Sequence, residues 1–178
     1  SFFALGFIDF PIITMHTAKL KLVQDDVLPL LYAGAMAVDA VAALIFGWLY
    51  DRIGVKSLMR STAISALFPL FIFGWGGQSK TALFIGIALW GVGMGAQESA
   101  LKAAVCTFVP KQLRSSGFGV FETAFGVFWF LGSWLTGVLY DQALTGMIIF
   151  SILAQVVSIG CLGFCHHMHQ NTIAQKKD

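Results

Sequence analysis

The 178-residue chain is 57% hydrophobic and only 11% charged, and its formal net charge at pH 7 is +2. A soluble domain carries about a quarter charged residues, so the composition excludes an ordinary soluble fold. The small net charge, with no basic stripe interleaved with aromatic residues, also excludes nucleic acid as an expected partner. The composition predicts an all-α integral membrane protein in contact with a lipid bilayer.

Six apolar segments follow one another along the chain, each close to the roughly 20 residues that an α-helix needs to cross a bilayer. Membrane-spanning helices are therefore expected at 1–18, 27–50, 58–75, 81–109, 117–140 and 144–165. The short links between them are polar or rich in glycine, so neighbouring helices should run antiparallel. We expect one bundle over 1–165 and a polar tail over 166–178. An apolar start without Met favours a fragment of a longer protein.

The positions of Lys and Arg predict which side of the membrane each link faces, because these residues concentrate in short cytoplasmic loops. Seven of the eleven fall on one side: Arg52, Lys56, Arg60, Lys111, Arg114, Lys176 and Lys177. Lys19, Lys21 and Lys80 fall on the other side, and Lys102 lies within the fourth segment. The chain is expected to be multi-pass in the cell membrane, inner or plasma, with the links near 51–57 and 110–116 and the C-terminus in the cytoplasm.

Ionisable residues within membrane spans are costly unless paired or hydrated, so they usually mark function or pairing. Five are expected inside spans, and we treat them as candidates for substrate binding or proton coupling: Asp9, Asp39, Glu98, Lys102 and Glu122. The third and sixth segments have none in their interiors, so those two helices can face lipid. The pattern therefore repeats after three helices, which indicates one repeat at about 1–75 and another at about 81–165.

A short motif also recurs after 90 residues, since Gly47–Asp51 reads Gly-Trp-Leu-Tyr-Asp and Gly137–Asp141 reads Gly-Val-Leu-Tyr-Asp. Each copy ends the middle helix of a three-helix unit. Because three is an odd number, the second unit would insert inverted. Inverted repeats are common in secondary transporters, whose substrate sites lie near the middle of the membrane.

Lys102 and Glu122 lie about equally far from the 110–116 turn, at 1.5 Å of rise per residue. We expect them to form an ion pair between the fourth and fifth segments, with Glu98 one turn from Lys102 and able to share it. Two interpretations stay open. The three charges hold two helices together, or they form a proton- or substrate-linked switch, because an acid in excess of its basic partners is protonated at moderate cost.

Small and aromatic residues within the segments suggest contacts between helices. Gly91 and Gly95, flanked by Gly86 and Gly93, and the pair Ser133 and Gly137 would let helix backbones approach closely, a role we favour over bending. Trp90, Trp129 and Trp134 would line a cavity or pack in the core. In the tail, Cys165–His169 contains metal-ligand residue types at crowded spacing, so no metal site or other cofactor is predicted.

The ten residues from Gly47 to Lys56 resemble the signature loop of the major facilitator superfamily, Gly-x-Leu-x-Asp-Arg-x-Gly-Arg-Lys. The positions that match are Gly47, Leu49, Asp51, Arg52, Gly54 and Lys56, whereas Val55 stands where the family often has Arg. The stretch from Val109 to Gly119 resembles the family's loop between helices ten and eleven. The resemblance implies that the chain is helices seven to twelve of a twelve-helix fold, whose N-terminal six-helix half is its missing partner.

The resemblance also implies a role for the loop itself. In the family, the corresponding aspartate and basic residues form a latch that favours one state of the transport cycle, a role carried to Asp51, Arg52 and Lys56. Independently of the family, Gly47 permits close packing, and Asp51 can accept hydrogen bonds at a neighbouring helix N-terminus. The alternative is a solvated loop that only sets topology.

The leading hypothesis is secondary active transport of a small solute by alternating access, coupled to an ion or to protons. It predicts a polar cavity at mid-membrane that is touched by the charged residues. A membrane scaffold or assembly partner is the alternative, and it predicts charges that are paired and sealed with no cavity. A membrane-embedded enzyme would need clustered nucleophiles or metal ligands, which the sequence does not offer, so the chain is not expected to be an enzyme.

Overall fold

The structure, a computed structural model, describes residues 2–21, 23–75 and 79–175, without the side chains of residues 25, 108 and 165–175. Every regular element in the described part is helical. The α-helices are α1 (Phe2–Gly6), α2 (Phe10–Lys19), α3 (Leu28–Ile53), α4 (Val55–Ser65), α5 (Lys80–Ala96), α6 (Lys102–Phe108), α7 (Arg114–Gln142) and α8 (Leu144–Gln175). Two short 3₁₀ turns, η1 (Asp25–Val27) and η4 (Lys111–Leu113), and two π-helical stretches, η2 (Leu70–Trp75) and η3 (Gln97–Leu101), complete the chain.

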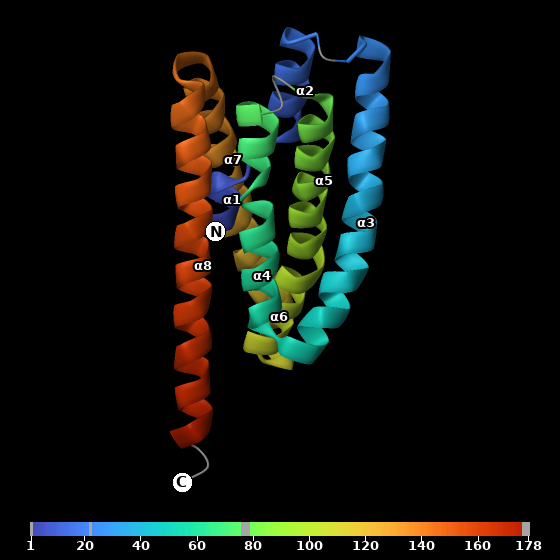
Figure 1. The fold of residues 1–178 in the computed structure, drawn as a ribbon. Coiled ribbons are helices and arrows are strands. Elements are labelled where there is room, and N and C mark those ends of the chain that lie inside the picture. Colours follow the sequence, from blue (N-terminus) through green and yellow to red (C-terminus); the bar gives the residue numbers. More distant parts are fainter. Residues whose placement is uncertain (1, 22, 76–78, 176–178) are drawn as a thin grey trace.

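The helices run up and down the long axis of the molecule in alternation (Figure 1). The link from α3 to α4, the link from α6 to α7 and the C-terminal end of α8 all lie at one end of the bundle. This arrangement agrees with the antiparallel order expected from the short links. It also brings the basic side chains of Arg52, Lys56, Lys111 and Arg114 to the same end.

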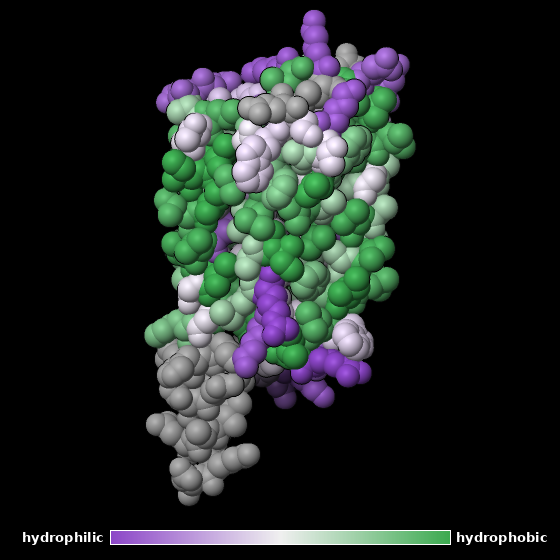
Figure 2. All heavy atoms as spheres, viewed as in Figure 1, coloured by the Kyte–Doolittle hydropathy of each residue, from purple (hydrophilic) through white to green (hydrophobic). Residues whose placement is uncertain are grey.

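In the described part of the chain, four helices are long and apolar enough to cross a membrane: Leu28–Ile53, Val55–Trp75, Lys111–Gln142 and Leu144–Phe164. Figure 2 shows a hydrophobic band across the face in view, with hydrophilic residues gathered mainly toward its two ends. The first and fourth predicted segments are each interrupted, by the break between α1 and α2 and by η3. The structure therefore describes an all-helical, multi-pass membrane protein, and six full spans stay a prediction.

The first segment was expected to be one helix over 1–18, and this prediction is wrong because the helix breaks at residues 7–9. Pro11, in the first turn of α2, has no backbone N–H and its ring would clash with the carbonyl of Phe7 in a continuous helix. Other helices satisfy the backbone groups that the break releases. The carbonyl of Ile8 accepts a hydrogen bond of 2.8 Å from the indole N–H of Trp90, and the carbonyl of Gly6 accepts one of 2.5 Å from the hydroxyl of Ser151.

Glycine allows α3 and α5 to approach closely. A Cβ on Gly91 would lie 2.6 Å from the carbonyl oxygen of Ala35, and one on Gly95 would clash with the carbonyl oxygen of Asp39. The packing role predicted for these two glycines is confirmed. For the predicted pair Ser133 and Gly137 the expectation is wrong at Gly137, where a Cβ would meet nothing within 4 Å.

The close approach on α7 occurs at Gly132 instead, where a Cβ would clash with the backbone of Leu5. This side of α7 packs against α1. This contact was not predicted, because it depends on how the broken first segment packs against α7.

Helices α4 and α8, which correspond to the third and sixth segments, pack against each other through buried polar side chains. The hydroxyl of Ser65 donates to the amide oxygen of Gln155 at 3.2 Å. Their other faces carry exposed apolar residues, including Leu67 on the α4 side and Leu153 on α8. These outer faces fit the expectation that both helices can face lipid.

Candidate functional site

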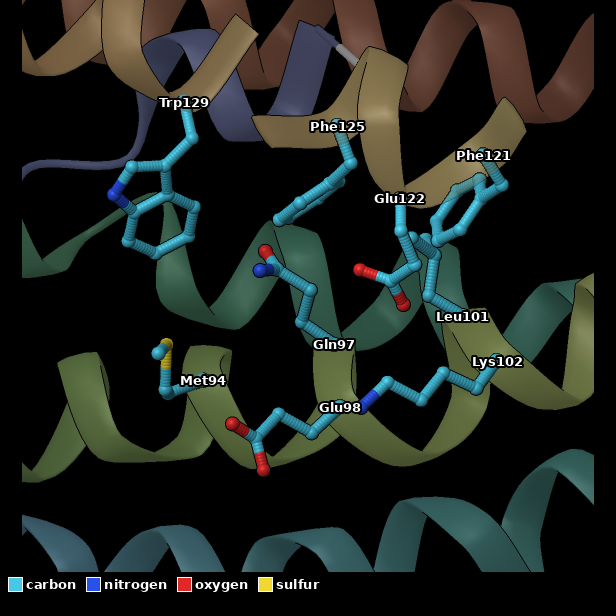
Figure 3. A pocket seen from close by; sticks show the side chains of 9 residues that line it. All are labelled: Met94, Gln97, Glu98, Leu101, Lys102, Phe121, Glu122, Phe125 and Trp129. Carbon is cyan, nitrogen blue, oxygen red and sulfur yellow. The ribbon is translucent and has the colours of Figure 1, made fainter. Parts of the chain in front are cut away.

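Helices α5 and α6 and the π-helical stretch η3 between them form one continuous helical rod from Lys80 to Phe108, called the α5–η3–α6 rod below. A cavity of about 260 Å³ lies between this rod and α7 (Figure 3). It collects three of the five ionisable residues predicted inside the membrane, Glu98, Lys102 and Glu122. The complete lining is Met94, Gln97, Glu98, Leu101, Lys102, Phe121, Glu122, Phe125 and Trp129. The predicted convergence of the fourth and fifth segments on one charged site is therefore present.

The π-helical stretch η3 lies at the centre of this wall. Its wider turn interrupts the α-helix from Gln97 to Leu101 and places Gln97, Glu98, Leu101 and Lys102 along the same cavity. Single turns of π-helix inside α-helices occur frequently at functional sites. The sequence shows no pattern that distinguishes such a turn from an ordinary helix, so η3 was not predicted.

The predicted ion pair between Lys102 and Glu122 is wrong as a direct contact. Among the described side chains, the single ion pair within 4.0 Å joins Lys19 to Asp141. Glu122 reaches into the cavity from α7, whereas the side chain of Lys102 extends along its own helix toward Glu98 (Figure 3). The cavity separates the two helices at this point, so charges at equal depth do not meet.

Aromatic rings form the α7 wall of the cavity. Phe121, Phe125 and Trp129 follow at intervals of four residues on one face of α7, with successive ring centroids 5.8 and 5.7 Å apart. Trp129 thus lines the cavity. Trp90 instead is a core residue, 3% exposed, and Trp134 is 63% exposed on the outer surface.

Gln97 contributes a buried polar group to the opposite wall. The side chain is 7% exposed, and its amide oxygen has no hydrogen-bond partner in the described part of the protein. In Figure 3 the amide extends from its helix toward the aromatic row of α7. A buried acceptor without a partner is costly, so Gln97 is suited to accept a hydrogen bond from a molecule in the cavity.

The other two predicted site residues, Asp9 and Asp39, do not line this cavity. Asp9 is the last residue of the break in the first segment and accepts a hydrogen bond from the hydroxyl of Ser133 on α7. Asp39 lies on α3, with one carboxylate oxygen buried and without a hydrogen-bond partner among the described residues. Its backbone packs against Gly95 of α5.

The loop that resembles the family signature is compact. Helix α3 ends at Gly54, whose φ of +61° is the left-handed conformation that glycine adopts without strain. Gly47 lies against the side chain of Ser99 in η3, where a Cβ would be 3.6 Å from the Cβ of Ser99. The loop therefore contacts the element that carries Glu98.

The charged residues of the loop, Asp51, Arg52 and Lys56, are exposed. The guanidinium of Arg52 lies over the Trp48 ring, 4.5 Å from its centroid. No side-chain hydrogen bond caps the N-terminus of α4, so Asp51 does not cap the helix that follows it in the chain. The reason is that α3 extends through Asp51 and only Gly54 separates it from α4.

The opposite end of the bundle carries a polar cluster that sequence reasoning missed. His16 is buried, and its Nδ1 lies 3.0 Å from the hydroxyl of Tyr140. The ammonium of Lys19 lies over the Tyr140 ring, 4.7 Å from its centroid, and 4.0 Å from the carboxylate of Asp141. The cluster joins the end of α2 to the end of α7.

Metal binding has no support in the described part of the chain, where no group of three or more His, Cys, Asp or Glu residues could hold an ion. The tail residues Cys165–His169, which the sequence analysis considered, lie outside the described side chains.

The family model described as Major Facilitator Superfamily matches residues 2–169. Uncharacterized proteins of Mycobacterium bovis and of two strains of Mycobacterium tuberculosis are each 34% identical over 155 residues. The match covers 87% of the chain but 37% of each relative, so the chain spans well under half the length of the curated relatives it matches. No solved structure matches the chain significantly.

Proposed function

The chain belongs to the major facilitator superfamily, and we propose that it forms one half of a secondary active transporter. In this proposal it carries a small solute across the cell membrane by alternating access, against an N-terminal six-helix half. Members of the family are transporters, which fits the expectation that the chain is not an enzyme. The C-terminus, the α3–α4 link and the α6–α7 link would face the cytoplasm.

The single observation that carries the proposal is the cavity between the α5–η3–α6 rod and α7. A scaffold protein would be expected to pair its membrane charges and seal them. Here Glu98, Lys102 and Glu122 line an open volume without an ion pair among them. Unpaired charges inside a membrane span are costly, which supports a role in binding a charged solute or ion.

The arrangement of helices as two inverted three-helix repeats is supported by contacts that recur 90 residues apart. Tyr140 bonds His16 near the end of the first segment, and Tyr50, its counterpart, donates to Thr107 near the end of the fourth segment at 3.4 Å. Ser65 and Gln155, which are themselves 90 residues apart, bond each other across the centre.

The glycine contacts follow the same rule. Gly132 of α7 packs on Leu5 of α1. In the repeat, the position equivalent to Gly132 is Ala42 of α3, and the position equivalent to Leu5 is Gly95 of α5. Gly95 does approach the α3 backbone on either side of Ala42, at Asp39 and Ala43. An inverted repeat accounts for both contacts with one operation.

For coupling, the proposal retains the five ionisable residues in two roles. Glu98, Lys102 and Glu122 act at the cavity, whereas Asp9 and Asp39 lie outside its lining, with Asp9 at the broken helix and Asp39 on α3 against Gly95 of α5. Discontinuous helices of this kind commonly form coupling-ion sites in transporters. Protons or a small cation would then alter the balance of charge during the cycle.

Flux into proteoliposomes tests the proposal. The full transporter, purified with the N-terminal six-helix half, is reconstituted and supplied with a panel of labelled cationic, neutral and anionic solutes. It should accumulate at least one of them when a proton or sodium gradient is imposed. Glu122→Gln should insert normally and lose most of the gradient-driven flux. Uptake in Glu122→Gln equal to wild type would contradict the coupling role, and no flux of any solute would contradict transport.

A further inference from the structure

We propose that the cavity between the α5–η3–α6 rod and α7 selects an organic cation, a protonated amine carried on an aromatic or otherwise flat apolar body. The inference deepens the proposed function, because it names the class of solute that would be transported. Binding to the cavity can nevertheless be measured without transport.

The charge of the cavity favours a monovalent cation. Two carboxylates, Glu98 and Glu122, face one ammonium, Lys102, which leaves one uncompensated negative charge when all three are ionised. The rest of the lining is largely apolar, so these charges act in a medium of lower dielectric than water and attract a cation more strongly.

The hydrogen-bonding groups of the cavity are mostly acceptors. Ionised carboxylates only accept, and the amide oxygen of Gln97, 7% exposed and without a partner among the described residues, accepts as well. The donors of the lining are the ammonium of Lys102, the amide nitrogen of Gln97 and the indole N–H of Trp129. A ligand that supplies N–H donors, such as a primary or secondary ammonium, would satisfy the buried oxygen that the protein leaves unpaired.

The aromatic wall of α7 suits an apolar, flat body and also stabilises a cation. Phe121, Phe125 and Trp129 present consecutive rings to the cavity, opposite the thioether of Met94. Cations bind over aromatic faces with about 0.5–2 kcal/mol, and Trp is the most favourable. Glu122 lies on α7 between Phe121 and Phe125 in sequence, so a charged head and a ring could be bound from the same helix.

Lys102 sets the affinity in this arrangement. Its ammonium partly neutralises the cavity when no ligand is bound and opposes an incoming cation. Removal of this charge should therefore strengthen cation binding, whereas removal of either carboxylate should weaken it. If Glu98, Lys102 and Glu122 had only a structural role, each of the three changes would lower the stability of the protein, and ligand affinities would not follow this order.

The test uses three probes that share one body and differ in the charge of the head group: phenethylamine, phenethyl alcohol and phenylpropionate. Each is titrated by calorimetry into the purified protein in lipid nanodiscs, to the solubility limit of the probe. Phenethylamine should bind at least about tenfold more tightly than the alcohol, which corresponds to about 1.4 kcal/mol, and the anion should bind most weakly.

Four variants separate the charges. Glu98→Gln and Glu122→Gln should each weaken phenethylamine binding about tenfold, and Lys102→Gln should strengthen it about threefold, while affinity for the alcohol stays unchanged. Asp26→Asn removes the same charge from an exposed position outside the cavity lining and should match wild type. Melting temperatures identify any variant that is misfolded, and the remaining ones still test the order.

Two outcomes would overturn the assignment: equal or weaker binding of the amine relative to the alcohol, or an unchanged amine affinity in both glutamine variants. Flux of a neutral or anionic solute together with either result would leave the proposed transport intact. Cation binding that follows the charge order, in a protein that transports no solute, would uphold the assignment and contradict the proposed function.

Discussion

Asp9 illustrates how one carboxylate is accommodated inside a membrane bundle. It follows a broken helix, and its partner is the hydroxyl of Ser133, 124 residues later in the chain. The sequence identified Asp9 as unusual because a charge stands within an apolar segment. It could not identify Ser133 as the partner, because that contact depends on α7 packing against the first segment.

Ser133→Ala should lower the free energy of unfolding by about 1–2 kcal/mol, because a half-buried carboxylate loses a hydrogen-bond donor. Thermal unfolding of the purified protein in detergent would measure the change. Ser115→Ala, an exposed serine at the start of the same helix, is the matched control and should leave stability unaltered. Equal melting temperatures for the two variants would mean that the contact contributes nothing.

For the residues of the cavity, too, some features could be predicted from the sequence and others could not. Glu98, Lys102 and Glu122 were expected to meet, and they do line one cavity, because depth in a membrane follows from residue count along a helix. The predicted ion pair between Lys102 and Glu122 is not formed, because equal depth in the membrane does not determine the distance between two helices. Gln97 was missed altogether, since a glutamine beside a glutamate has no distinguishing pattern in a single sequence.

At the scale of elements, glycine decides which helices lie close together. Gly91 and Gly95 bring α5 against α3, and the spacing of four residues was sufficient to predict that role. The break before α2 and the π-helical stretch η3 were not predicted. The break before α2 has a local cause in Pro11, which the span assignment overlooked, whereas η3 contains no residue that ordinarily interrupts a helix.

Gly95→Ala should destabilise the bundle by about 1–3 kcal/mol, because the added Cβ clashes with the backbone of α3 and the helices must separate. Gly126→Ala is the matched control on α7, where a Cβ meets nothing within 4 Å, and it should be neutral or stabilising. Denaturation in detergent, followed by circular dichroism, would compare them. Similar stability of both variants would argue against tight α3–α5 packing.

At the scale of the whole molecule, the two ends of the bundle differ in their contacts. The end that contains Asp51, Arg52 and Lys56 has exposed charges, whereas at the other end His16, Tyr140 and Lys19 join α2 to α7. The exposed charges fit a surface that contacts a second half during part of a transport cycle, as the latch hypothesis requires.

Asp51→Asn should reduce the maximal rate of transport several-fold with little change in the apparent affinity for solute, because a latch affects exchange between states rather than the cavity. Initial rates in proteoliposomes over a range of solute concentrations would separate the two parameters. Asp26→Asn serves as the control for loss of an exposed carboxylate. Unchanged rates in Asp51→Asn would favour the alternative of a solvated loop.

The break at residues 7–9 has a consequence for the order in which the protein assembles. The groups that satisfy its carbonyls belong to Trp90 and Ser151, which are 82 and 145 residues further along the chain. At about 5–20 residues per second, a ribosome needs several seconds or more to make them. Until then the freed carbonyls in the first segment must be hydrated or bound by other molecules. Biogenesis of this segment therefore depends on two helices that are translated well after it, α5 and α8.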